Sequence, residues 1–176
     1  MIEIEILKKE KTPHNVIDHS IAVCKKACEI AENFPEADLD IIQKGALLHD
    51  IGRSRTHGIT HAVEGVKIAR EYGYGDDVLN VIERHIGAGI TKKEAKELNL
   101  FEKSYVPETL EEKIVAHADN LISGTEEVDV DFVIMTNSFI ICCKKLPPII
   151  EKHILYMGGS TFLCQLFYCG RLRLGH

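Results

Sequence analysis

Apolar residues recur along most of this 176-residue chain at the spacing of one helix face, which predicts an all-α fold. The first long helix is expected from about Pro13, because proline suits the first turn of a helix, to about Asn33. An alternation typical of strands occurs only at Ile2, Ile4 and Ile6. This run is too short to build a sheet by itself.

Capping residues and glycines divide the remaining pattern into shorter helices. Thr91 and Thr109 are each followed three residues later by glutamate, the spacing of a capping box. Gly52 suits a left-handed turn at a helix C-terminus, and Gly87 and Gly89 suit a tight turn. The later helices are expected from Asp38 or Asp40 to Gly52, from Thr60 to Tyr72, from Asp76 or Asp77 to Gly87, after Thr91, after Thr109, and over 129–145 and 148–157. The prediction is a bundle of about six to eight helices.

The last quarter of the chain has a different character. Residues 1–131 carry 16 Lys+Arg and 26 Asp+Glu, whereas residues 132–176 carry 5 and 1. Residues 158–176 have no clear period, and their apolar run FLCQLFYC is much shorter than the roughly 20 residues of a membrane helix. We expect a single domain over 1–157 and a tail over 158–176, which either covers the core or is not native to the domain. A homo-oligomer in which this tail packs on a second subunit stays open.

Composition excludes several classes of protein. With 45% hydrophobic and 27% charged residues, the chain is neither disordered nor collagen-like. A domain of this length buries about two-thirds of its unfolded surface, so it needs no metal merely to fold. The net charge of -6 argues against a long nucleic acid bound on a basic surface. The six cysteines have no C-x-x-C spacing, and the start MIEIEILKKE does not resemble a signal peptide, so we expect a cytoplasmic protein without a membrane segment.

Residues that can bind metals interrupt several apolar helix faces. A lone histidine in such a place is more often a hydrogen-bonded core residue than a ligand. A buried aspartate is harder to explain, because leaving it unpaired costs several kcal/mol. No lysine or arginine is expected on the same faces, so a divalent ion would supply the missing charge. The residues concerned are His19, His49, Asp50, His61, His85 and Asp119.

The order of these residues resembles a known pattern. His19, then LLHDIG at 47–52, then Asp119 in IVAHADNLI reproduce the H…HD…D order of the HD superfamily of metal-dependent phosphohydrolases. HAVEGVKIA at 61–69 and VIERHIGAG at 81–89 resemble the segments that supply two more ligands in its binuclear branch. That branch includes bacterial diadenosine tetraphosphate hydrolases, and small archaeal HD proteins are more similar still. The resemblance implies an all-α HD-domain bundle around a metal site.

The resemblance also implies a role for each candidate ligand. It assigns the first metal to His19, His49, Asp50 and Asp119, and a second metal to Asp50, His61 and His85, with Asp50 as the bridge. A site rich in histidine favours one or two transition ions, Fe, Mn, Co, Ni or Zn, over Mg²⁺, which prefers an oxygen shell. A hydroxide that bridges the metals would then attack the phosphorus.

Basic residues near this pattern are candidates for binding the substrate. Arg53 and Arg55 directly follow the HDIG turn and are expected to contact substrate phosphates, with a solvated loop as the alternative. Asp50 and Arg53 are the expected catalytic residues. Lys92 and Lys93 are weaker candidates, for which an exposed helix start is favoured.

The expected substrate is a small phosphate ester, such as a nucleotide. A phosphomonoesterase, a cyclic phosphodiesterase and a dinucleotide polyphosphate hydrolase are not separated by these residues. Phe101 and Tyr105 either stack on a nucleobase or pack in the core, and packing is favoured. The alternatives to an enzyme are a helical module that senses nucleotides without turnover, and a structural site with a closed metal shell.

Overall fold

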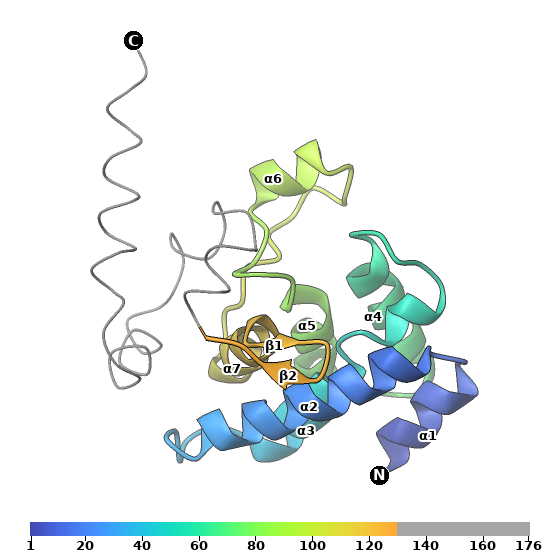
Figure 1. Cartoon of the computed structure of the whole chain (residues 1–176). Helices are drawn as coiled ribbons and strands as arrows, with labels where there is room; N and C mark the ends of the chain where they lie inside the picture. The colour runs from blue at the N-terminus through green and yellow to red at the C-terminus, as the bar shows by residue number, and fades with distance from the viewer. Residues whose placement is uncertain (130–176) are drawn as a thin grey trace. The chain divides into compact units, whose positions relative to one another are not determined.

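The computed structural model describes residues 1–129, whose regular secondary structure is almost entirely helical (Figure 1). The elements are α1 Ile2–Lys9, α2 His14–Ala31, α3 Leu39–Leu48, the 3₁₀ helix η1 Ile51–Ser54, α4 His61–Glu71, α5 Asp76–Arg84, α6 Lys92–Glu97, α7 Leu110–Asn120, and the strands β1 Ile122–Ser123 and β2 Glu126–Glu127. Residues 1–128 form one compact unit. Within residues 1–129, none of the helices is both long and apolar enough to cross a membrane. The predicted all-α class is confirmed.

Most helix starts lie where the capping residues predicted them. Pro13 is the N-cap of α2, Asp38 accepts two backbone N–H bonds at the start of α3, and Thr91 forms a complete capping box with Glu94. The helices predicted at 129–145 and 148–157, the domain end at 157 and the tail at 158–176 lie outside the described residues.

Gly52 does not end a helix in a left-handed turn, so that prediction is wrong. The helix α3 ends at Leu48, and Gly52 lies in η1 without a positive φ. A Cβ atom on Gly52 would lie 1.9 Å from the carbonyl oxygen of His61 and 2.6 Å from the backbone nitrogen of Gly65. Glycine is required here because η1 packs backbone to backbone against the first turn of α4.

Apolar clusters pack the helices of residues 1–129 together. One contains Leu7 from α1, Leu48 from α3 and Ile82 from α5, all fully buried. It also explains the Ile2–Ile6 alternation, which lies in α1, where Ile6 is buried in this cluster. Another cluster lies beneath α6. It contains Ile90, Ala95 and Tyr105.

A buried ion pair joins α5 to α7. The Arg84 guanidinium lies 3.0 Å from the Glu112 carboxylate, which is 2% exposed and also accepts the backbone N–H of Glu108. Thr109 caps the Glu112 N–H, but the Glu112 side chain does not return to Thr109. The second predicted capping box is therefore only half formed, because the carboxylate pairs with the partly buried Arg84 instead.

A short antiparallel hairpin follows α7 and was not expected from the sequence. Its strands β1 and β2 are joined through Gly124, whose φ of +64° favours glycine. The buried ammonium of Lys26 in α2 lies 2.6 Å from the Glu127 carboxylate in β2. The hairpin is thus attached to α2 by an ion pair.

Candidate metal centre

Helix ends from distant parts of the sequence bring six candidate ligands together. His49 and Asp50 directly follow α3, His61 is the first residue of α4, and His85 directly follows α5. The remaining two lie within helices: His19 in α2 and Asp119 in the last turn of α7.

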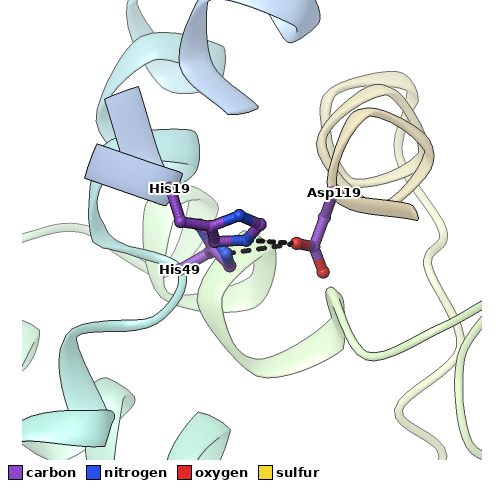
Figure 2. Close-up of side chains that lie close together, drawn as sticks. All are labelled: His19, His49 and Asp119. Carbon is purple, nitrogen blue, oxygen red and sulfur yellow. Dashed lines mark hydrogen bonds and ion pairs between the residues drawn. The ribbon is translucent and has the colours of Figure 1, made fainter. Parts of the chain in front are cut away.

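Two imidazoles lie beside the carboxylate of Asp119 (Figure 2). Its Oδ1 lies 2.9 Å from Nε2 of His19 and 3.4 Å from Nε2 of His49. These three residues present one ligand atom each within 4.8 Å of one another, as a metal ion requires.

Asp50 lies between the remaining imidazoles. Its Oδ1 is 3.1 Å from Nε2 of His61 and 3.6 Å from Nε2 of His85, and its Oδ2 is 3.7 Å from Nε2 of His49. His49, Asp50 and His85 form a second set of ligand atoms within 4.8 Å of one another. His61 falls outside both sets, although its Nε2 is 3.1 Å from Nε2 of His85. The residue shared by the two sets is His49, whereas the sequence pattern led us to expect sharing through Asp50.

The backbone fixes which nitrogen of each imidazole faces the centre. In all four histidines Nδ1 donates to a backbone carbonyl, which can only accept, so Nδ1 carries the proton. The acceptors are Gly124 for His19 at 2.8 Å, Ala46 for His49 at 2.7 Å, Gly58 for His61 at 2.8 Å and Ile82 for His85 at 2.8 Å. In the neutral rings Nε2 then offers its lone pair, which is how metal-binding histidines are oriented.

Two buried atoms at this centre have no hydrogen bond from the described residues. They are Nε2 of His49 and Oδ1 of Asp50. Leaving such atoms unsatisfied costs about 1–3 kcal/mol each. His61 and His85 also face each other Nε2 to Nε2 without a hydrogen to share. A divalent cation would satisfy all of these lone pairs, so the residues present fit a metal ion.

The charges at the centre are strongly coupled. Burial alone would raise the pKa values of Asp50 and Asp119, but the charge of His49 and the other imidazoles beside each carboxylate hold both well below their usual range. Burial opposes a charge on His49, yet Asp50 and Asp119 outweigh it and raise its pKa to about 9. Burial, reinforced by His49, lowers the pKa of His85 to about 4. Without a metal and at neutral pH, His49 is therefore positively charged and His85 is neutral.

Arg53 contradicts the expectation that no lysine or arginine pairs with the buried aspartates. Its Nε donates to Oδ2 of Asp50 at 2.6 Å, so an arginine does serve this carboxylate. The reason is η1, since side chains three residues apart overlap in a 3₁₀ helix. Arg55 instead lies 3.6 Å from the Glu10 carboxylate. Substrate binding by either arginine stays a prediction.

The structure also tests the predictions for the residues that follow His85. Gly87 and Gly89 have positive φ values, which confirms the predicted turn. Lys92 and Lys93 are exposed at the start of α6, the favoured alternative. The Tyr105 ring is buried, as packing predicts.

Two residues near this turn differ from expectation. Phe101 is 78% exposed, which contradicts the predicted core packing of its ring. Asn120 was not predicted to have a role. Its side-chain amide donates to the carbonyls of Gly87 at 2.9 Å and Ala116 at 2.7 Å, so it ties the turn after His85 to α7. Its position next to Asp119 was the available signal.

The centre has a solvent-facing side. The side chains of His19, Asp119 and Arg53 are 17%, 21% and 32% exposed, whereas that of His49 is fully buried. A molecule from solution therefore meets α2, α7 and η1 first.

Comparisons with known proteins place this chain among its relatives. The family model of the HD domain matches residues 16–124. An uncharacterized protein of Methanocaldococcus jannaschii is 54% identical over 130 residues, which cover 72% of this chain and 77% of that protein. The tRNA (cytidine(56)-2'-O)-methyltransferase of Picrophilus torridus is 49% identical over 118 residues, 67% of this chain but only 34% of the methyltransferase.

A solved structure shares the fold. The HD domain of the L. monocytogenes phosphodiesterase PgpH aligns with a TM-score of 0.54 at 20% sequence identity, covering 74% of this chain and 79% of that chain. At this level of identity the similarity concerns the arrangement of helices.

Proposed function

Because the chain belongs to the HD domain family of metal-dependent phosphohydrolases, we propose that it hydrolyses a phosphoester or phosphoanhydride of a nucleotide or a related small molecule. The observation that carries this proposal is the cluster of four imidazoles and two carboxylates, in which two buried atoms have no hydrogen bond from the described residues. A histidine with a purely structural role would not place several unpaired nitrogen and oxygen atoms around one point.

The metal ions we propose are one or two divalent transition ions, Fe, Mn, Co, Ni or Zn. His19, His49 and Asp119 would hold one, and His49, Asp50 and His85 would hold the other. His61, whose Nε2 is 3.1 Å from Oδ1 of Asp50, is proposed as a further ligand of the second ion. Such ions, when bound, lower the pKa of water and neutralise phosphoryl oxygens.

Arg53 is the proposed contact for the substrate phosphate. Its Nε is used by Asp50, which holds the guanidinium at the edge of the centre and leaves its terminal N–H groups for phosphoryl oxygens. His19 and Asp119 of the same centre are also partly exposed. This open side favours an enzyme over a structural site, whose metal shell would be closed.

The substrate class is tested with a panel of small phosphates. Nucleoside monophosphates, cyclic nucleotides and dinucleoside polyphosphates are incubated with Mn²⁺, Ni²⁺, Co²⁺ or Fe²⁺. Short RNA is added because the similar methyltransferase acts on tRNA. We expect hydrolysis that chelation abolishes and that Asp50→Ala abolishes on every substrate. The exposed neighbour of His19 provides a matched control, Asp18→Ala, which should keep activity.

Two results would contradict the enzyme proposal. One is less than about one metal ion per chain together with hydrolysis that chelation does not change. The other is wild-type turnover by Asp50→Ala, which would remove this residue from the site.

The role of Arg53 is tested by kinetics. Arg53→Ala is expected to raise KM about tenfold or more while metal content stays intact, since a charge-assisted bond to phosphate contributes about 1.5–3 kcal/mol. Arg55→Ala is the matched comparison on the same turn, where Glu10 already pairs with the guanidinium. Unchanged kinetics in Arg53→Ala would assign Arg53 to the support of Asp50 alone.

A further inference from the structure

His19 differs from the other candidate ligands in how its ring is oriented. His49, His61 and His85 lie at helix ends, and each Nδ1 donates to the carbonyl three residues earlier. His19 lies inside α2, where the preceding carbonyls accept the hydrogen bonds of the helix itself. Its Nδ1 acceptor instead comes from another element: the carbonyl of Gly124, 105 residues away.

The acceptor belongs to the β1–β2 hairpin, which lies beside α2 (Figure 1). Gly124 forms the turn between the strands, and the backbone N–H of Val128 donates to the Leu121 carbonyl at 2.8 Å across the base of the hairpin. His19 is thus held between the turn of the hairpin and Asp119, whose Oδ1 lies 2.9 Å from Nε2.

Lys26 attaches this hairpin to the helix that carries His19. It follows His19 by seven residues, about two turns, so both lie on the same face of α2. Its side chain is 4% exposed, and its ammonium lies 2.6 Å from Glu127 and 3.0 Å from Glu29. A buried charge is tolerated only when it is paired. Since Glu29 belongs to α2 as well, of these two bonds of Lys26 the one to Glu127 joins the helix to the hairpin.

We propose that the hairpin is a positioning device for the imidazole of His19, and that Lys26 is the positioning residue that holds it on α2. Within residues 1–129 Lys26 forms its ion pairs with Glu29 and Glu127, not with His19 or Asp119, so it acts through the hairpin. This inference rests on the proposed function, because it takes His19 as a metal ligand. Metal affinity therefore depends on a contact outside the centre.

The first test measures Co²⁺ affinity of the full chain by competition with a chelator. Loss of an outer partner of a metal-binding histidine weakens affinity about 10–100-fold, and we expect this for Lys26→Met and for Glu127→Gln. Glu29→Gln is the matched control, since it removes the carboxylate that does not reach the hairpin. Both Glu29→Gln and the conservative Lys26→Arg should bind Co²⁺ as the wild type does.

The second test reads the tautomer of His19 without metal. Imidazole ¹⁵N shifts of the metal-free protein should show the proton on Nδ1 of His19 in the wild type. In Glu127→Gln, whose substituted side chain is half exposed, only the His19 signal should change. Far-UV circular dichroism checks that the helices stay folded.

Three results would overturn the proposal. Wild-type Co²⁺ affinity in Lys26→Met and Glu127→Gln, with weak binding by His19→Ala, would overturn the role of the hairpin and leave the metal centre standing. An equal loss in Glu29→Gln would show that neutralising Lys26 matters, not the link to the hairpin. Wild-type affinity in His19→Ala would remove His19 from the ligand set and overturn both proposals.

Discussion

At the scale of single residues, the backbone decides the chemistry of the histidines. Sequence order was enough to select His19, His49, His61 and His85, because apolar helix faces rarely place so many imidazoles inward. It could not show which nitrogen faces the centre, because the Nδ1 acceptors are carbonyls with no sequence signature. It also missed the bond from Arg53 to Asp50, since that bond depends on the 3₁₀ geometry after α3.

The pKa of His49 gives metal binding a pH dependence. Below a pH of about 9, His49 of the metal-free site carries a second proton, on Nε2, and a metal must displace this proton. Between about pH 6 and pH 8, Co²⁺ affinity should rise about tenfold for each pH unit, as expected for one proton released. Chelator competition at several pH values measures this slope.

Stability of the metal-free protein should follow the opposite direction. The pKa of His49 is raised from 6.5 to about 9 on folding, so its contribution to the free energy of unfolding is fully present below a pH of about 6.5 and is lost as the pH rises through about 9.

A Co²⁺ affinity that does not change with pH would contradict the first of these two predictions, because it would show that His49 is already neutral before the metal binds.

At the scale of elements, local signals predicted the helices and failed where two segments meet. Thr91 and Asp38 cap helices by bonds within a few residues, so the sequence is sufficient. Gly52 could serve a left-handed turn or a close contact, and only the packing of η1 on α4 decides between them. The β1–β2 hairpin was missed because strands of two residues are too short to alternate.

The contact between η1 and α4 can be tested by adding one methyl group. Gly52→Ala is expected to destabilise the protein by about 1–3 kcal/mol or more, because the backbone of His61 cannot yield as a flexible side chain would. Its metal affinity should fall too, since Asp50 and His61 flank this contact. Urea unfolding and Co²⁺ competition measure the two effects.

The control for this variant is Gly58→Ala. A Cβ there would meet only Thr56 Oγ1, at 3.9 Å, so its stability should be unchanged or slightly higher. Equal effects of the two substitutions would contradict a specific role for the contact.

At the scale of the whole molecule, the acidic charge and the proposed substrate are compatible. Residues 1–131 have 26 acidic and 16 basic side chains, yet two divalent ions would add four positive charges at one place. The family and fold were predictable because the ordered motif covers most of the helical unit. The substrate was not, because loops and side chains around the centre, such as the exposed Phe101, carry no specific signature.

Metal removal should lower stability without unfolding the chain. A unit of this size has enough core to fold alone, so helical circular dichroism should survive chelation. Restoring Co²⁺ at about 100 times its Kd should add about 2.7 kcal/mol to the free energy of unfolding. Thermal unfolding with and without the ion measures the difference. Loss of helical signal on chelation would instead favour a structural metal.

The unequal exposure of the candidate ligands also has a kinetic meaning. His49, Asp50, His61 and His85 are buried, whereas His19 and Asp119 are partly exposed. An ion among the buried ligands would leave slowly, and one beside the exposed ligands would exchange with the surroundings. The identity of the inner ion would then record which metal was present when the chain folded, while the outer ion would follow the current supply.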